Sequence, residues 1–333
     1  MTESCSLNVA VLMATYNGAQ FVECQIRSFK NNVTPFTLHW LDDQSTDDTR
    51  SMVRDTAQSV GVDLREWHQQ QHQGVPAAFF QLLECVEADI YLFSDQDDIW
   101  QEGKIDATVS NLLPHLNSPV LYSSDPYLFR DGAPDKLHRL SKVVGTDLKR
   151  ALEESRLFMS TIAQGHTQGF TRPLRDLFMK HREIARAYAV MHDIWMHVIA
   201  VAAGTICRPT GVPTTLYRWH GDNASQTFVS WRGRGAGYLA SSRFQLARTR
   251  RSLSRLAEGF ILAAPTLPKT EKVERLIELA RLVVTLDRRQ SLGSLYRLMR
   301  SGVLWPSRRL ALELVTSCFL FSYSHRLPDT SAS

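Results

Sequence analysis

The 333-residue sequence has few cysteines and no long apolar run, and both shortages argue against particular classes of protein. Its five cysteines are scattered and form no C-x-x-C pair, which argues against a zinc site or a disulfide scaffold. No uninterrupted apolar stretch reaches the roughly 18–20 residues that a membrane-spanning helix needs. Because no basic leader precedes the first apolar run, we expect a cytoplasmic protein.

Familiar nucleotide-binding loops are also missing. The sequence contains no G-x-x-x-x-G-K-[ST], and no G-x-G-x-x-G follows the first predicted strand. The G-x-S-x-G nucleophile elbow of hydrolases is also absent. Walker-type ATPases and dinucleotide-dependent oxidoreductases therefore lose support.

The net charge of +4 conceals an uneven distribution along the chain. Residues 231–333 contain 18 Lys and Arg against 7 Asp and Glu, a balance of +11, whereas the remainder has 20 against 27, a balance of −7. We expect the acidic and basic parts to have different roles. Ordinary contents of 44% hydrophobic and 22% charged residues predict a packed core.

The hydrophobic pattern predicts an α/β fold. Strands are expected near 7–14, 36–41, 62–67, 89–94 and 118–123, and helices near 18–31, 46–60, 76–87 and 102–114. This alternation predicts a mostly parallel sheet sandwiched by helices. A further helix near 192–203 and a strand-like segment near 212–220 complete a domain over 1–228. Pro265, Pro268 and Pro306 divide the basic region 229–333 into at least three helices, which form a C-terminal appendage.

Polar segments follow three of the predicted strands, where ligands bind in such sheets. "TYNG" follows the first, "DDQSTDDT" the second and "SDQDD" the fourth. In the second segment, Ser45 or Thr46 could cap the next helix, which leaves Asp42 and Asp43 unexplained.

Three acids crowd the segment "SDQDDIW", namely Asp95, Asp97 and Asp98. Like charges this close disfavour joint ionisation unless a cation or solvent compensates them. An EF-hand is excluded, because the positions that need Gly and Glu hold Trp100 and Asp106. A short D-x-D can instead hold Mg²⁺ or Mn²⁺ together with substrate phosphates. The alternative is a solvated acidic turn that caps the helix near 102.

Two later residues have ordinary explanations when taken alone. Asp193 opens an amphipathic helix, where an N-cap is the simple interpretation. His220 follows an apolar strand in "YRWHGDN" and could be a structural histidine.

Six motifs in order carry a resemblance. The segments "VAVLMATYNG", "DDQSTDDT", "SDQDDIW", "GHTQGFTR", "HDIW" and "YRWHGDN" span about residues 7–223. Together they resemble family-two inverting glycosyltransferases of the GT-A fold, in particular the bacterial rhamnosyltransferase-like branch.

The resemblance implies a role for individual residues. The donor nucleotide would meet Thr15, Tyr16, Asn17, Asp43 and Asp95, with Tyr16 against the base, Asp43 on the pyrimidine N–H and Asp95 near the ribose. Asp97 and His220 would reach the metal, Mg²⁺ or Mn²⁺, or the diphosphate. Asp193 matches the catalytic base, and the acceptor-side loop would contain Gly165, His166, Thr167 and Gln168.

Three positions depart from the family pattern. Gln44 stands where Gly is common, so a turn built for positive φ would be strained. Ala78 replaces an Asn that contacts the nucleotide. His192 replaces the Glu before the base, and we expect this change to matter most for the pH profile.

The resemblance implies transfer of a sugar, with rhamnose as the first candidate, from a nucleoside diphosphate to a glycan or lipid-linked acceptor. The alternatives are a sugar-1-phosphate nucleotidyltransferase and a non-catalytic sugar-nucleotide binding module. Arg308, Arg309 and Arg326 bracket an apolar stretch, so residues 231–333 could lie on an anionic membrane surface or simply pack on the catalytic domain. No nucleic-acid partner is expected, because aromatic and basic residues do not interleave.

Overall fold

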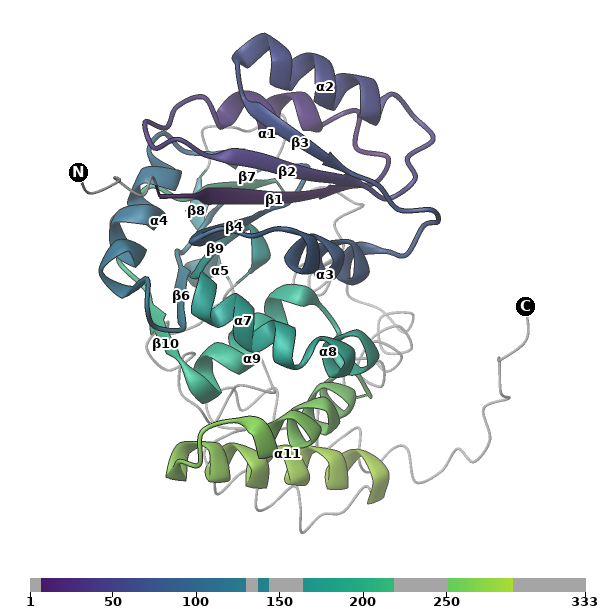
Figure 1. Cartoon of the computed structure of the whole chain (residues 1–333), viewed down its shortest axis with the longest axis vertical. Coiled ribbons are helices and arrows are strands. Elements are labelled where there is room, and N and C mark those ends of the chain that lie inside the picture. The colour runs from purple at the N-terminus through teal and green to yellow at the C-terminus, as the bar shows by residue number, and fades with distance from the viewer. Residues whose placement is uncertain (1–6, 130–136, 144–163, 219–250, 290–333) are drawn as a thin grey trace, which may run out of the picture.

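A seven-stranded sheet forms the centre of the computed structural model, which describes residues 7–129, 137–143, 164–218 and 251–289. The strand order is β10-β6-β9-β4-β1-β2-β3, and the pairs are parallel except those of β9 (Figure 1). The strands are β1 (Val9–Thr15), β2 (Thr37–Asp42), β3 (Asp63–Trp67), β4 (Ile90–Ser94), β6 (Val120–Ser123), β9 (Gln168–Thr171) and β10 (Thr205–Cys207). The expected mostly parallel sheet is confirmed.

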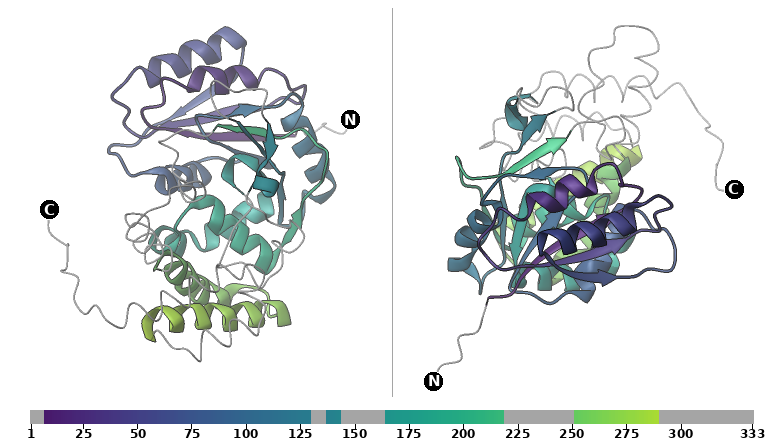
Figure 2. Two further views of the ribbon diagram at one scale, coloured as in Figure 1. Left: turned by 180° about the vertical axis from the view of Figure 1, so that it is seen from behind. Right: turned by 90° about the horizontal axis from the view of Figure 1, so that it is seen from above.

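Helices cover both faces of this sheet, and the three views of Figures 1 and 2 agree on the layers. One face packs against α1 (Val22–Ser28), α2 (Thr49–Val60) and α4 (Lys104–Leu112), which is followed by a 3₁₀ turn, Leu113–His115. The other face packs against α3 (Val75–Cys85), α7 (Arg172–Lys180), α8 (Arg182–Tyr188) and α9 (His192–Ala203). Helix α2 buries one apolar stripe, whereas α9 is buried on all sides over residues 195–202, so the amphipathic pattern expected for it is wrong.

A second, four-stranded sheet begins directly after the acidic segment. Its order is β5-β11-β7-β8, and its strands are β5 (Ile99–Trp100), β7 (Tyr127–Phe129), β8 (His138–Arg139) and β11 (Thr215–Arg218). A short helix, α5 (Leu140–Val143), follows β8. Because β11 pairs with β5, the chain after β10 returns to the acidic segment.

The described C-terminal helices pack on the α/β domain. Residues 251–263 are helical, a 3₁₀ turn spans Ala264–Thr266, and α11 spans Glu271–Arg289. Leu256, Phe260 and Leu276 are buried in the same core as α9. The expected interruption at Pro265 and Pro268 is confirmed, whereas the boundary near 228 and Pro306 lie outside the described residues.

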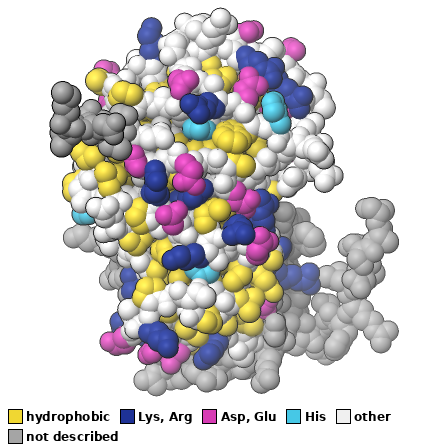
Figure 3. All heavy atoms as spheres, viewed as in Figure 1, with side chains coloured by type: hydrophobic (Ala, Val, Ile, Leu, Met, Phe, Trp, Pro, Cys, Tyr) yellow, Lys and Arg dark blue, Asp and Glu magenta, His cyan; other side chains and the backbone are white. Residues whose placement is uncertain are grey.

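The surface of the described residues is mixed in character. On the face drawn in Figure 3, acidic and basic side chains lie intermixed, with apolar side chains between them. None of the described helices is both long and apolar enough to cross a membrane.

The topology gathers the polar segments on one edge of the large sheet. Strands β1, β2, β3, β4, β6 and β10 run in the same direction, so their carboxyl ends share an edge. Strand β9 runs in the opposite direction and begins at that edge. Helix α9 leads into β10 and therefore also begins there. Segments 15–17, 42–45, 94–98, 165–168 and 192–193 thus meet.

Candidate functional site

The segment after β1 presents an exposed aromatic ring. Tyr16 is 42% exposed, although hydrogen bonds with Gln96 hold its backbone: its N–H donates to Gln96 Oε1 (2.9 Å) and its carbonyl accepts from Nε2 (3.2 Å). Asn17 has a positive φ of 46°, and its Oδ1 accepts from the Thr46 N–H (2.8 Å). The Tyr16 ring lies 4.2 Å from that of His72. This ring is available for stacking.

The two acids at the end of β2 have separate roles. Burial raises the pKa of Asp42, but hydrogen bonds from Ser45 and Arg50 outweigh burial and hold the pKa below its usual value. Thr15 Oγ1 also donates to Asp42 (2.9 Å), so this acid is structural. Ser45 therefore binds Asp42 (2.5 Å) instead of capping α2, which begins at Thr49.

Asp43 lies beneath the loop that precedes α3. Its Oδ1 accepts from the Gln73 N–H (2.9 Å), and its Oδ2 accepts from the Gly74 N–H (2.7 Å). His72 Nδ1 lies 3.0 Å from Oδ2. The family resemblance assigned this carboxylate to the nucleobase. The contacts hold it beside His72, whose ring lies against that of Tyr16. The positive φ predicted for Gln44 is confirmed at 69°.

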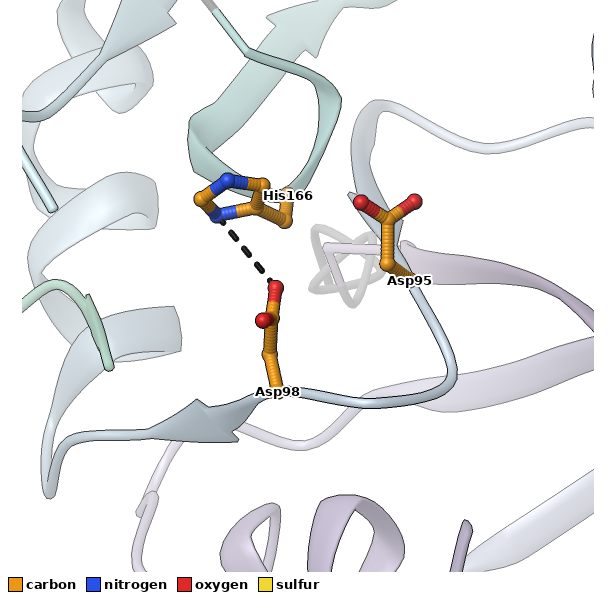
Figure 4. A group of neighbouring side chains, drawn as sticks. All are labelled: Asp95, Asp98 and His166. Atoms are coloured by element: carbon orange, nitrogen blue, oxygen red, sulfur yellow. Dashed lines mark ion pairs between the residues drawn. The ribbon is translucent and has the colours of Figure 1, made fainter. Parts of the chain in front are cut away.

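The acidic segment after β4 forms a compact cluster with a histidine. Asp98 is fully buried, and its Oδ1 accepts from the Arg218 N–H (3.0 Å). Its Oδ2 has no hydrogen-bond partner and lies 3.4 Å from His166 Nδ1 (Figure 4). One ligand atom from each of Asp95, Asp98 and His166 lies within 4.8 Å of the others. Oxygen and imidazole donors in this arrangement could hold a divalent metal ion.

The electrostatics of the cluster also favour a cation. Burial, with the charges of Asp97 and Asp193, raises the pKa of Asp95 to about 8. Burial, with the charges of Asp97 and Asp95, raises the pKa of Asp98 well above its usual value. Burial lowers the pKa of His166 to about 3, so its imidazole is neutral, as a metal ligand must be. A divalent ion would remove the repulsion among these carboxylates, so the residues present fit such an ion.

A buried lysine lies near these acids. Lys104 is almost fully buried at the start of α4, and its Nζ lies 3.2 Å from the centre of the Trp100 ring. Burial lowers its pKa well below the usual value, while Asp98 and Asp95 oppose that shift. Its Nζ has no hydrogen-bond partner, so it does not occupy the ligand atoms of the acids.

Asp193 faces the loop that precedes β9. Its Oδ2 accepts from the Gly165 N–H (2.9 Å), and its Oδ1 accepts from the Ile194 N–H (2.7 Å). Burial raises its pKa to about 6, and backbone hydrogen bonds oppose that shift. The simple N-cap interpretation is wrong, because Met191 holds the N-cap position of α9. The charge of Asp193 contributes to the raised pKa of Asp95.

The predicted acceptor-side loop lies between Asp193 and the acidic cluster. Gly165–Thr167 forms a 3₁₀ turn, and Gln168 Nε2 donates to the Asp193 carbonyl (3.0 Å). His166 turns toward Asp98, and its ring stacks on Tyr217 at 4.8 Å. The structure thus places His166 with the metal candidates, although the sequence assigned it to the acceptor side.

The side chain of His192, next to Asp193 in the sequence, packs among aromatic rings. His192 stacks on Phe79 (3.9 Å) and meets Phe93 edge-on (4.6 Å), and neither ring nitrogen has a hydrogen-bond partner. Burial lowers its pKa to about 3, so it is neutral at physiological pH and cannot shape the pH profile there by titrating. Ala78 is buried within α3 and offers no polar side-chain atom.

Sequence reasoning missed part of this site. Asp98 belonged to a recognised acidic segment but received no role, and nothing in the sequence distinguished it from Asp97. Asp97 is close enough to raise the pKa of both neighbouring acids, and its metal role stays a prediction. His220 lies outside the described residues.

Two solved structures share this architecture over most of the chain. S. aureus TarS 1-349 in complex with UDP aligns with a TM-score of 0.55 at 13% identity, over 97% of this chain and 95% of that one. The mannosyltransferase PcManGT from Pyrobaculum calidifontis, in complex with GDP-Man and Mn²⁺, aligns with a TM-score of 0.53 at 20% identity, over 95% and 80%. The fold is therefore the GT-A type of glycosyltransferases.

The sequence comparisons agree with the fold. Residues 10–163 match the model for Glycosyl transferase family 2. The dTDP-rhamnosyl transferase RfbG of Shigella flexneri is 24% identical over 230 residues, covering 67% of this chain and 76% of RfbG. Protein RfbJ of the same organism is 27% identical over 108 residues, covering 32% and 78%. The resemblance to this family is confirmed.

Proposed function

We propose that the protein is an inverting glycosyltransferase, which moves a sugar from a nucleoside diphosphate to an acceptor hydroxyl with Asp193 as the general base. One observation carries the proposal. The Asp193 carboxylate, with a pKa near 6, is held by the Gly165 N–H at the acceptor-side loop and lies close enough to Asp95 to raise its pKa. A base poised near the working pH and adjacent to the donor acids is what direct displacement needs.

Donor binding is assigned to the edge formed by β1, β2 and β4. The nucleobase would stack on Tyr16, and its N–H would donate to Asp43, whose Oδ1 accepts a single backbone hydrogen bond. Asp95 would meet the ribose. TarS and PcManGT are named for complexes with UDP and GDP-Man, and RfbG for dTDP-rhamnose transfer. A dTDP- or UDP-sugar is therefore the proposed donor, with rhamnose first.

Metal binding is assigned to the acidic cluster. Asp95, Asp98 and His166 would hold Mg²⁺ or Mn²⁺, with Asp97 and His220 as further candidates. When bound, the ion would supply electrostatic stabilisation of the negative charge on the departing diphosphate.

The proposed reaction is a single displacement. Asp193 takes the proton of the acceptor hydroxyl, and the oxygen attacks the anomeric carbon from the face opposite the diphosphate. The new carbon–oxygen bond forms as the bond to the phosphate oxygen breaks, and its electron pair leaves with the nucleoside diphosphate. The anomeric configuration inverts because one displacement occurs.

A binding panel followed by product analysis tests this proposal. Nucleoside diphosphates and their sugars are added with Mn²⁺ or EDTA while thermal unfolding is followed, and we expect metal-dependent stabilisation by one base. Asp193→Asn should keep that stabilisation while transfer falls by roughly 10²–10⁴-fold, as loss of a general base implies. Near wild-type turnover in this variant would remove the base assignment.

Product identity separates the alternatives. A sugar-1-phosphate nucleotidyltransferase would release pyrophosphate from a nucleoside triphosphate, whereas a binding module would leave the donor intact. NMR of the transferred sugar should show an anomeric configuration opposite to that of the donor. Retention would contradict the single displacement.

Cytoplasmic localisation and contact with an anionic membrane through residues 231–333 are a further part of the proposal. Support comes from the +11 balance of that region, since each basic residue near an anionic surface contributes about 1 kcal/mol. Such contact suits a lipid-linked acceptor. Arg308→Glu with Arg309→Glu should reduce sedimentation with phosphatidylserine vesicles, and equal pelleting would argue for packing alone.

A further inference from the structure

The carboxyl edge of the sheet extends beyond the acceptor-side loop to a buried arginine. Arg208 directly follows β10, and its Nε, Nη1 and Nη2 are all buried without a hydrogen-bond partner. Burial lowers its pKa, although arginine retains its charge in proteins. A guanidinium that has lost water without gaining an acceptor is unfavourable unless an anion joins it.

The strand register places Arg208 on the face of the sheet that carries Asp193. Ile206 pairs with Leu121 and packs toward α9, whereas Cys207 packs toward α4. Side chains alternate along a strand, so Arg208 returns to the α9 face at the level of Ser123. Ser123 pairs with Gln168, which binds the Asp193 carbonyl. Two strand spacings separate Arg208 from Gln168, a distance of about 10 Å.

Among the described residues, none forms a hydrogen bond with the Arg208 guanidinium. His197 lies one turn after Asp193 on α9, feels the charge of Arg208, and has an unpaired, buried Nδ1. Burial lowers the pKa of His197 to about 4, so it is neutral at physiological pH. Asp125 attracts Arg208 from a distance, but its Oδ2 accepts from Ser141 Oγ (2.6 Å) and its Oδ1 from the Ser141 N–H (3.2 Å).

A cavity borders the residues that bind Asp125. Its volume is about 430 Å³, and Tyr127, Leu137, His138, Arg139 and Lys142 line it. The Arg139 guanidinium stacks on Tyr127 at 4.0 Å and donates to the Asp125 carbonyl. The cavity is of the size that takes small ligands, and Arg139 and Lys142 give it a basic lining.

We propose that Arg208, with His197 beside it, binds an oxyanion of the acceptor, a phosphate or carboxylate, on the face of the sheet that carries Asp193. The acceptor part of this inference rests on the proposed function, whereas the anion site itself does not. The guanidinium presents five N–H donors in a planar fork that matches either oxyanion. The anion and the hydroxyl that Asp193 activates would be different parts of one acceptor.

Thermal unfolding of the full-length protein tests the anion site. Inorganic phosphate is titrated in EDTA against chloride at equal ionic strength, so that no metal can recruit phosphate to the donor site. We expect saturable stabilisation of the wild type, loss of that stabilisation in Arg208→Met, and a weaker effect in Arg208→Lys. Arg182→Gln is the matched control, because Arg182 is exposed and paired with Glu183 on α8.

The unfolding temperature of Arg208→Met without phosphate also distinguishes an anion site from an arginine with a purely structural role. Without phosphate, Arg208→Met should unfold at a higher temperature than the wild type, because it removes a buried charge that has no partner. Equal phosphate stabilisation of wild type and Arg208→Met, or none beyond chloride in the wild type, would overturn the site. If the methionine variant does not fold, the lysine variant decides by the same comparison.

A second set of ligands assigns the anion to the acceptor. Hexose 1-phosphates and glucuronate should protect the wild type at lower concentrations than inorganic phosphate, and methyl glucoside should not protect it. Protection by free phosphate alone would contradict the acceptor assignment. Nucleoside diphosphate with Mg²⁺, titrated in parallel, should stabilise Arg208→Met normally, so a failure of donor binding is seen independently of the anion site.

Discussion

Asp193→Asn should make the folded protein more stable at neutral pH while it removes activity. An asparagine amide has the shape of a protonated carboxyl group but never ionises. Burial raises the folded-state pKa of Asp193 from 3.8 to about 6, so the structure favours the neutral form of this side chain. The wild type must nevertheless keep a charge there above pH 6, and the variant need not.

The pKa difference sets the size of the effect. About two units at roughly 1.4 kcal/mol per unit give up to about 3 kcal/mol of extra stability for the variant above pH 7. Because the folded pKa is raised, the favourable contribution of Asp193 is complete below pH 3.8 and is lost as pH rises through 6. The stability gap between variant and wild type should therefore be small near pH 4 and open between pH 4 and 7.

Urea unfolding in EDTA at pH 4, 5.5 and 7.5 measures this gap without metal. Loss of the Asp193 charge also relieves Asp95, which acts in the same direction. Ser59→Ala on α2 is a suitable control, since its stability difference should not depend on pH. A variant no more stable than the wild type at pH 7.5, or a gap that is unchanged at pH 4, would refute the argument that burial raises this pKa.

Three further substitutions test other parts of the site. Tyr16→Ala should weaken nucleoside diphosphate binding by about 1–3 kcal/mol, the usual value of base stacking, and calorimetry that shows unchanged affinity would exclude stacking. Asp98→Asn should lower Mn²⁺ affinity at least tenfold in a metal titration, and unchanged affinity would move the ligand role to Asp97. Gly74→Ala should cost about 1–3 kcal/mol of folding stability, because φ 84° and ψ 167° suit glycine almost alone and a Cβ would meet nothing. Gly61→Ala, at φ 72° in the αL region, should cost less in the same urea experiment.

The longer helices and strands were predictable because each depends on the local hydrophobic pattern. The predicted strand near 89–94 is β4, Ile90–Ser94, and the predicted helix near 192–203 is α9, His192–Ala203. Apolar runs of this length bury themselves in the same way in any α/β sheet. The helix expected from residue 46 begins only at Thr49, because Ser45 binds Asp42.

The short strands were not predictable from local pattern. Strand β9 has four consecutive buried residues, Gln168–Thr171, two of them polar side chains that bind distant groups. The two-residue β5 exists only because β11 returns to pair with it. Such segments have no periodicity of their own, so their partners define them.

The sequence by itself determined the fold class, the family and the polar segments at the strand ends, because periodicity and ordered motifs are local properties of a chain. Only the tertiary structure decided that Asp98 and His166 lie together, that His192 is buried and neutral, and that the Arg208 guanidinium is buried without a hydrogen-bond partner. Burial and proximity depend on which distant segments pack around a side chain. They set its charge, and no single segment of sequence contains that information.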